Sequence, residues 1–125
     1  MEIKRTKDRI DKTGEIFTPK ELVNEILDKF PDFAFTDESK TFCDPACGDG
    51  NFLVEILLRK LKNGHNIHKA LSTIYGVDIM DDNVELCKSN LLKIAGENDE
   101  SKRIVDNNII CYNSLNYDWC FNGNK

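Results

Sequence analysis

The sequence predicts an α/β domain in which three short strands alternate with helices, preceded by one further helix at the N-terminal side. Apolar residues recur at three- and four-residue spacing in several segments, which is typical of helices that bury one face. Between these segments lie short runs of β-branched and aromatic residues, each followed by a polar turn. This alternation favours parallel strands joined by right-handed crossovers.

The size and charge of the chain narrow the class of protein. Its 125 residues suit a single domain, and we expect residues 1–12 to be a basic, solvated leader and residues 13–125 to be the domain. The net charge of −5 argues against this chain holding a nucleic-acid backbone by itself, the basic leader excepted. No apolar run approaches the roughly 20 residues of a membrane span, and no signal-peptide pattern is visible. We therefore expect a cytoplasmic protein.

The cysteines and histidines do not suggest a metal site. Five cysteines, an odd number without framework spacing, favour a reducing compartment over disulfides. Cys43 and Cys47 are four residues apart and have no second pair of Cys or His residues at metal-ligand spacing. His65 and His68 fall on a connection, where we expect surface loop histidines.

The first helix is expected to begin near a threonine. Thr18 is placed as the N-cap, Pro19 as the first helical residue, and Glu21 closes a capping box. The spacing of the apolar residues then predicts a helix of about three turns that ends before Pro31. The segment 31–40 is polar and turn-rich.

A strand, a turn with two glycines and a buried helix follow. The strand covers about 41–44, and the proline after it cannot donate to a sheet ladder. Gly48 and Gly50 allow the backbone to approach a ligand closely, although a plain connection that happens to hold two glycines remains the alternative. The helix begins near Asn51, is apolar around most of its circumference, and stops at Gly64.

The second strand and the third helix are predicted from the next segment. A short helical turn through 70 and 71 leads into a strand at 73–77, which ends at Asp78. Asp82, with Glu85 three residues later, is placed to open the helix through a capping box.

The last part of the chain completes the pattern. The third helix stops at Gly96, and the charged run 97–103 is expected to be solvated. A third strand covers about 108–112, and the tail 116–125 has no clear periodicity. These elements together predict one half of a Rossmann-like sheet.

Three polar residues follow the strands, at the sheet edge where parallel α/β sheets bind ligands. They are Asp44, Asp78 and Asn113. The Asp78 carboxylate has two acceptor oxygens, enough for both hydroxyls of a ribose, the alternative being an aspartate that only caps a turn or helix.

Two common nucleotide-binding motifs do not fit this turn. A dinucleotide fingerprint would need glycine at position 53, where this chain has Leu53. The ribose acid also falls about 30 residues after the glycines rather than about 20. A P-loop is excluded because no Gly-Lys-Ser/Thr follows the turn.

The motifs instead resemble those of adenine-N6 DNA methyltransferases. Residues 44–52, Asp-Pro-Ala-Cys-Gly-Asp-Gly-Asn-Phe, resemble the family's S-adenosylmethionine-binding motif, Asp-Pro-x-Cys-Gly-x-Gly-x-Phe. Residues 14–19, Gly-Glu-Ile-Phe-Thr-Pro, resemble the motif that precedes it in the permuted order of that family. Residues 76–79 resemble the next motif and residues 113–115 the one after. The resemblance covers about residues 13–118.

This resemblance implies a partial Rossmann-like methyltransferase fold with S-adenosylmethionine as cofactor. By the resemblance, Gly48 and Gly50 let the backbone approach the methionine moiety, with Asp44 close to its ammonium. Asp78 holds the ribose, and Ile79 packs on the adenine face. The segment of Phe17, Thr18 and Pro19 closes over the methionine end.

Asn113 departs from the family pattern, which usually has aspartate there to accept from the adenine amino group. An amide oxygen still accepts this hydrogen bond but lacks the charge, which would weaken cofactor binding somewhat. The candidate cofactor-binding residues implied by the resemblance are Phe17, Thr18, Pro19, Asp44, Pro45, Ala46, Gly48, Gly50, Phe52, Asp78, Ile79, Asn113, Ser114 and Leu115.

The family's catalytic tetrapeptide, Asp/Asn-Pro-Pro-Tyr/Phe, is not found in the sequence. No Pro-Pro occurs, and the sequence stops at Lys125, about where a fourth strand would begin. We therefore expect the cofactor-binding part of a restriction-modification DNA adenine methyltransferase, inactive alone and reaching DNA through a missing or separate part. The alternatives are a non-catalytic S-adenosylmethionine-binding or interaction module, and a methyltransferase acting on another substrate.

A fourth strand would lie beside the first one, so its absence leaves an open sheet edge. Open edges invite pairing with other strands, and uncovered apolar surface marks interfaces. We expect self-association, pairing with a second chain, or cover by the tail 116–125, where Trp119, Cys120 and Phe121 would suit that role.

Overall fold

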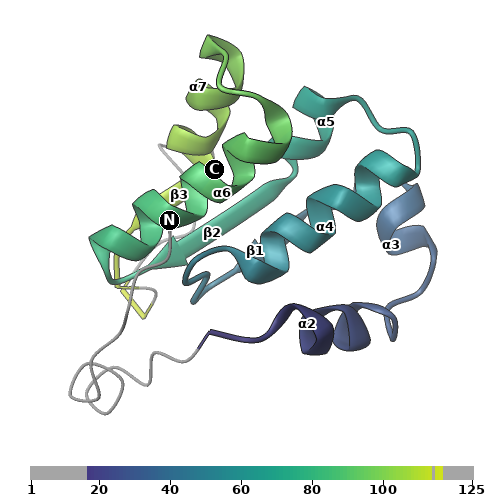
Figure 1. The fold of residues 1–125 in the computed structure, drawn as a ribbon, viewed down its shortest axis with the longest axis horizontal. Coiled ribbons are helices and arrows are strands. Elements are labelled where there is room, and N and C mark those ends of the chain that lie inside the picture. The colour runs from purple at the N-terminus through teal and green to yellow at the C-terminus, as the bar shows by residue number, and fades with distance from the viewer. Residues whose placement is uncertain (1–16, 114, 117–125) are drawn as a thin grey trace.

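A computed structural model describes residues 17–113, 115 and 116, which form a three-stranded parallel sheet and the helices around it (Figure 1). The leader and most of the tail lie outside the described residues. The strands occur in the spatial order β1-β2-β3. Their bounds are β1, Phe42–Asp44; β2, Ile74–Asp78; and β3, Ile109–Cys111.

The register brings the carboxyl ends of all three strands to one edge of the sheet. Asp44 lies opposite Gly76, which in turn lies opposite Ile109, and Asp78 lies opposite Cys111. The predicted α/β class with three parallel strands is therefore confirmed. This register places the residues that follow the strands next to one another.

The helices connect and cover the strands. Figure 1 shows α4 and α6 side by side across the sheet, with α2 alongside α4. No helix of the described residues is long and apolar enough to cross a membrane. The bounds are α2, Lys20–Leu27; α3, Phe33–Thr36; α4, Asn51–Lys62; α5, Ile67–Ser72; α6, Asp81–Ala95; and α7, Asp99–Asn108.

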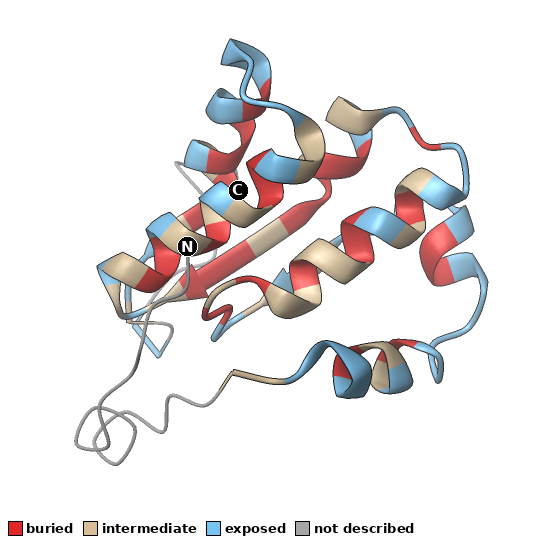
Figure 2. Ribbon diagram, viewed as in Figure 1, coloured by how far each residue is buried: buried red, intermediate tan, exposed pale blue. Residues whose placement is uncertain are grey.

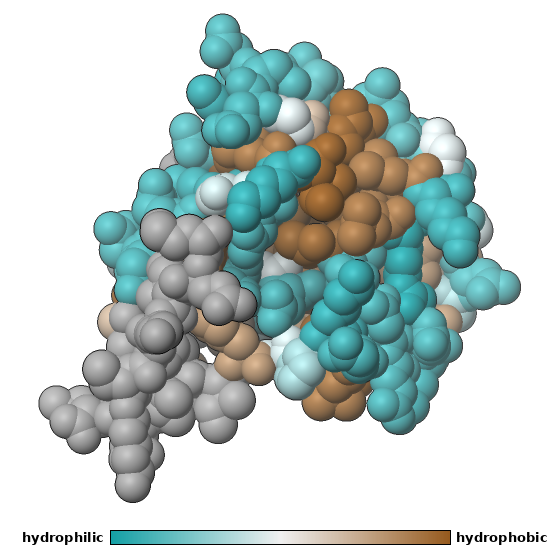
Figure 3. Space-filling model, viewed as in Figure 1, coloured by the Kyte–Doolittle hydropathy of each residue, from teal (hydrophilic) through white to brown (hydrophobic). Residues whose placement is uncertain are grey.

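The core lies between the sheet and the helices α4 and α6 (Figure 2). Leu53 and Leu57 of α4 and Leu91 of α6 are among its fully buried side chains. Partly buried apolar side chains continue this core to the surface, where they gather between α4 and α6 (Figure 3). Packing in this layer fixes α4, and with it the glycine turn from which α4 begins.

Both predicted capping boxes are wrong. Pro19, with φ −61° and ψ 148°, is the N-cap of α2, and no side chain caps this helix. At the next site, α6 begins at Asp81 after Met80, again without a side-chain cap. The Asp78 carboxylate accepts the backbone N–H of Met80 at 2.8 Å, so a residue before the helix already organises the turn at which it starts.

The first helix is also shorter than predicted. It ends at Leu27 after eight residues, and the separate helix α3 forms at Phe33–Thr36, inside the segment expected to be turns. Ala34 and Phe35 of α3 are buried, and Phe35 stacks on Phe42 of β1 at a ring-centroid distance of 5.6 Å. Tertiary stacking of aromatic rings thus supports a helix too short to stand alone.

The charged run 97–103 is exposed except for Ser101, as expected, but from Asp99 onward it forms the first half of the helix α7, which was not predicted. Asn98 caps this helix by accepting the Ser101 N–H at 2.8 Å. Ile104 and Val105 are buried on its inner face, while charged residues cover the outside. The helix was missed because only two apolar residues mark its buried face. The strand that follows, β3, lies within the predicted range.

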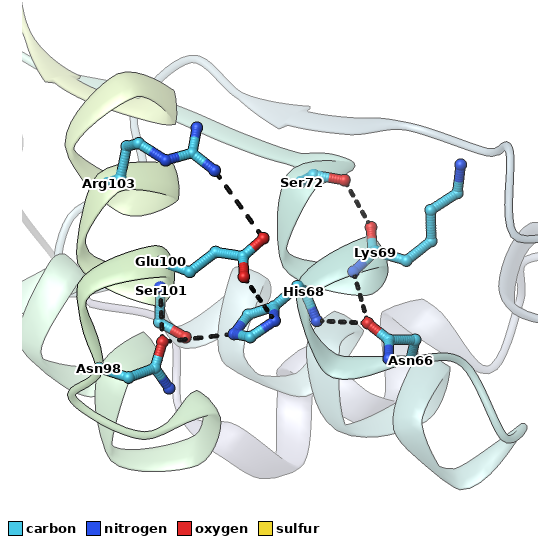
Figure 4. A network of polar contacts seen from close by, with 8 residues as sticks. All are labelled: Asn66, His68, Lys69, Ser72, Asn98, Glu100, Ser101 and Arg103. Atoms are coloured by element: carbon cyan, nitrogen blue, oxygen red, sulfur yellow. Dashed lines mark hydrogen bonds and ion pairs between the residues drawn. The ribbon is translucent and has the colours of Figure 1, made fainter.

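The prediction of surface histidines is wrong for His65 and incomplete for His68. His65 is only 7% exposed, and its Nε2 lies 3.1 Å from the Thr36 carbonyl oxygen. His68 belongs to α5 rather than to a loop, and its ring lies between Asn98 and Glu100 (Figure 4). Both rings therefore join elements far apart in the sequence.

Candidate functional site

The glycine turn between β1 and α4 adopts a conformation that requires glycine. Gly48 and Gly50 have φ values of 54° and 87°, in the left-handed region that other residues adopt at a cost. A Cβ on Gly50 would lie 2.8 Å from the Sγ of buried Cys87, so space as well as conformation selects glycine there. The turn therefore brings its backbone against α6.

Hydrogen bonds to β2 and from α6 also hold the glycine turn. The Cys47 N–H donates to the Val77 carbonyl of β2 at 2.9 Å. From α6, the Asn90 side chain donates to the Asp49 carbonyl at 2.9 Å. These bonds tie the largely buried turn to both neighbouring elements.

Asp78 lies at the carboxyl end of β2 and bridges the glycine turn to the start of α6. Its Oδ2 accepts the Gly48 N–H at 2.9 Å. Its Oδ1 accepts from the Met80 N–H at 2.8 Å and from the Asn83 side chain at 3.2 Å. An ionised carboxylate has about four acceptor positions, so about one remains for a ligand hydroxyl, fewer than the two considered from sequence.

The segment of residues 17–19 lies on the glycine turn. A Cβ on Gly48 would lie 3.0 Å from Cε1 of Phe17, so the ring covers that glycine. The Asn51 side chain donates to the Thr18 carbonyl at 2.6 Å. Pro19 follows as the exposed N-cap of α2. The preceding residues of this motif, 14–16, lie outside the described residues.

Asp44 is the last residue of β1 and lies at the same edge of the sheet as Asp78. Its Oδ1 accepts the Ala46 N–H at 3.0 Å. Burial raises the pKa of this carboxyl, and the nearby charge of Asp78 raises it further. Ala46 and Pro45 are exposed. A half-buried carboxylate that accepts the Ala46 N–H is suited to a cationic partner, because such a partner would offset its desolvation.

The residues expected around an adenine ring lie beside Asp78. Ile79 is 60% exposed, which leaves its apolar side chain open to a flat ligand. The Tyr112 N–H donates to the Asp78 carbonyl at 2.9 Å and so brings Asn113 to this edge. The Asn113 Oδ1 accepts the Leu115 N–H at 3.0 Å, and Leu115 is 91% exposed. Ser114 lies outside the described residues.

A hollow with a volume of about 560 Å³ runs along the edge of β1 that faces away from β2. Its lining includes Phe30, Phe33, Phe42 and Phe52, so the predicted site residue Phe52 faces this groove. We call it the β1 groove. Among the described residues β1 pairs only with β2.

Sequence reasoning missed the asparagines that order this site. Asn51, Asn83 and Asn90 bind the 17–19 segment, Asp78 and the glycine turn respectively. Nothing in their sequence spacing indicates these contacts, which depend on how α4 and α6 pack. No group of three or more His, Cys, Asp or Glu side chains in the described part of the chain is arranged to hold a metal ion.

Comparison with known proteins identifies the family. The family model described as N-6 DNA Methylase matches residues 4–122. The chain belongs to this family. It is also 38% identical over 87 residues to the Type II methyltransferase M.VspI of Vibrio sp. (strain 343). That match covers 69% of this chain but only 18% of the relative, so the chain spans about a fifth of the methyltransferase it resembles.

Membership of the N-6 DNA methylase family agrees with the resemblance read from the motifs. The family match includes the glycine turn, Asp78 and residues 17–19.

Proposed function

We propose that this chain binds S-adenosylmethionine as the cofactor-binding part of a DNA adenine-N6 methyltransferase. One observation carries the proposal: the glycine turn, Asp78 and Phe17 converge at the carboxyl ends of β1 and β2. Family membership supports methyl transfer to DNA as the reaction of the whole enzyme.

The residues present fit the cofactor. Gly48 and Gly50 are buried, and each allows a close backbone approach that a Cβ would prevent, with Phe17 over Gly48 and Cys87 against Gly50. Asp78 keeps about one acceptor position for a ribose hydroxyl, and exposed Ile79 offers an apolar face for the adenine ring. Asp44 offers a partly desolvated carboxylate to the methionine ammonium. The cofactor, when bound, supplies an activated methyl group, and these side chains bind and orient it.

For the whole enzyme we propose transfer of this methyl group to N6 of an adenine flipped out of the DNA duplex, in a cytoplasmic restriction-modification system. The similarity to a Type II methyltransferase supports a role in methyl transfer. The second candidate is a non-catalytic S-adenosylmethionine-binding module, which would share the cofactor site.

Calorimetry of the chain with S-adenosylmethionine tests the proposal, with Asp78→Asn as the variant. The amide keeps Oδ1 for Met80 and Asn83, but its NH₂ cannot accept the Gly48 N–H or a ribose hydroxyl. We expect affinity to fall about 5- to 150-fold, corresponding to about 1–3 kcal/mol. Asp81→Asn, an exposed residue three positions later, is the control. A parent chain that binds no cofactor would refute the proposal.

We also propose that a second chain or a second copy pairs with the free edge of β1. The Phe42 N–H donates to the carbonyl of Thr73, the residue just before β2, so the backbone groups of Cys43 face away from β2 because strand residues alternate. Beside them lies the apolar β1 groove, where Phe33 is 56% exposed. Exposed edges and apolar patches of this kind are pairing sites.

Sedimentation at micromolar concentrations tests the edge, with and without residues 116–125. We expect concentration-dependent association of the parent chain. Cys43→Pro should abolish it, because proline removes an outward N–H and leaves the β2 ladder intact. A parent chain that remains monomeric both with and without its tail would contradict the proposal.

A further inference from the structure

One face of α4 carries a polar stripe on a helix that is otherwise largely apolar. Asn51, Glu55 and Arg59 follow at intervals of four residues, which places them in one row along the helix. Each of them contacts the segment that contains α2. We call this row the α4 stripe.

The contacts of the α4 stripe run in order along α2. At the first position, the Asn51 side chain donates to the Thr18 carbonyl at 2.6 Å. In the middle, Glu55 accepts from the Asn24 side chain at 2.9 Å. At the far end, Arg59 contacts Asp28 at 2.7 Å. The stripe therefore matches α2 from just before its first residue to just after its last.

These contacts set the position of α2 more narrowly than its apolar packing does. The buried residues of α2 are Val23 and Leu27. Apolar burial is non-directional and tolerates sliding along α4, whereas hydrogen bonds require defined distances and angles. Figure 1 shows the two helices alongside each other, with the glycine turn at the start of α4.

The bond from Asn51 gives a hydrogen-bond donor to the Thr18 carbonyl, which has no place in the helical bonds of α2. The helical bonds of α2 begin with the Val23 N–H donating to the Pro19 carbonyl, so the Thr18 carbonyl lies before the ladder. Asn51 supplies a donor to this carbonyl. The residue before Thr18 is Phe17, whose ring covers Gly48. The bond to Thr18 therefore fixes Phe17 over the glycine turn.

We propose that Asn51 is a positioning residue, which holds the Phe17–Thr18 segment as a wall of the cofactor site while Glu55 and Arg59 set the alignment of α2. This inference rests on the proposed function, because the wall has a role only if the cofactor binds at the glycine turn. Asn51 acts through Phe17 and Thr18 and does not itself contact the cofactor.

The test uses Asn51→Asp, because the protonation of the new carboxyl decides whether the wall is held. An ionised carboxylate cannot donate to the Thr18 carbonyl and repels it, whereas a protonated carboxyl donates. In the first turn of α2, which packs on α4, lie Lys20 and Glu21. The acidic groups next to residue 51 on its own side are Asp49, whose Oδ1 accepts the residue-51 N–H at 3.2 Å, and Glu55 one turn along α4. Both are acidic and favour protonation of the new carboxyl as the pH falls.

Calorimetry with S-adenosylmethionine is run on both chains from pH 8 to pH 5. We expect the variant to bind about tenfold more weakly than the parent at pH 8 and to approach the parent at pH 5. The ratio of the two affinities removes any pH dependence that both chains share, such as that of Asp44. Asn51→Ala removes the donor without adding a charge. The affinity of this variant divided by that of the parent should therefore be lower than one and independent of pH.

Amide hydrogen exchange without cofactor gives an independent measurement of the wall. Residues 17–22 should exchange faster in Asn51→Asp than in the parent at pH 8, while α6 is unchanged. Asn63→Asp is the matched control, because Asn63 also donates to a backbone carbonyl, that of Arg59 at 2.8 Å, but does not contact α2. It should change neither exchange nor affinity.

The outcomes separate the two proposals. Equal affinity of the parent and both Asn51 variants overturns the positioning role while leaving the proposed function intact. Weaker binding without faster exchange of residues 17–22 also overturns it, because Asn51 would then act directly on the cofactor. A parent chain that binds no cofactor at any pH overturns the proposed function and this inference with it.

Discussion

Replacing Gly50 by alanine should destabilise the fold strongly, because two separate costs meet at this residue. Gly50 has φ 87° and ψ 20°, and the left-handed conformation costs a residue with a Cβ about 1–2 kcal/mol. The new Cβ would also lie 2.8 Å from Cys87 Sγ and 3.4 Å from Cys87 Cα. Cys87 is fully buried, so relief requires movement of α6.

The expected magnitude follows from adding the two costs. Overpacking of a well-packed core costs about 1–3 kcal/mol, so the total is about 2–5 kcal/mol. A domain of this size has a free energy of unfolding of about 5–15 kcal/mol. The variant should therefore fold but lose a large part of its stability.

Urea unfolding of matched variants separates the two costs. Gly64→Ala is the control, because Gly64 has φ 85° but a Cβ there would meet no atom within 4 Å. It should lose only the conformational part, about 1–2 kcal/mol. In Gly50→Ala/Cys87→Ala the sulfur is gone, so the double variant should be more stable than the two single losses predict, by about 1–3 kcal/mol.

Two results would refute this reasoning. If Gly50→Ala and Gly64→Ala lose the same stability, the contact with Cys87 carries no energy. If the losses of Gly50→Ala and Cys87→Ala simply add, the glycine is required for its conformation alone.

The remaining predictions concern two ionisable groups, half-buried Asp44 and buried Lys60. The pKa of Asp44 is raised by burial, so the folded state holds its proton more tightly than the unfolded state, and stability should fall as pH rises above about 4. Asp44→Asn keeps an acceptor for the Ala46 N–H, so its urea midpoint should fall less than that of the parent from pH 4 to pH 7; an identical decline would contradict this. Lys60 is fully buried, donates to the Lys40 carbonyl at 2.7 Å and has a pKa lowered by burial. Lys60→Met keeps the packing volume and should change the free energy of unfolding by less than about 1.5 kcal/mol. Lys60→Ala should lower that free energy by about 2–4 kcal/mol. Equal losses in the two variants would show that the charge of Lys60, and not its buried stem, stabilises the fold.

The parts of the fold that the sequence predicted well are those with local causes. Gly48 and Gly50 mark a turn because their left-handed backbone depends on the residue itself. The α4 helix was evident because its apolar residues are numerous and its end is marked by Gly64. Local chemistry of this kind can be read without knowing what surrounds it.

Each incorrect prediction failed because a residue of another element decides the local structure. Asp82 and Glu85 have the spacing of a capping box, but Asp78 at the end of β2 organises the start of α6 instead. His65 lies in a polar connection and is nevertheless buried against the Thr36 carbonyl of α3. In each case the deciding partner belongs to another element.

By itself, the sequence determined the α/β class, the parallel strands and the residues that line their carboxyl ends, since these follow from residue spacing and backbone preference. Only the tertiary structure decided that Asp78 already accepts three hydrogen bonds and that Asn51 reaches Thr18. Such contacts depend on the packing angle and register of whole helices. Small contributions from many distant residues set that packing, and no short stretch of sequence contains it.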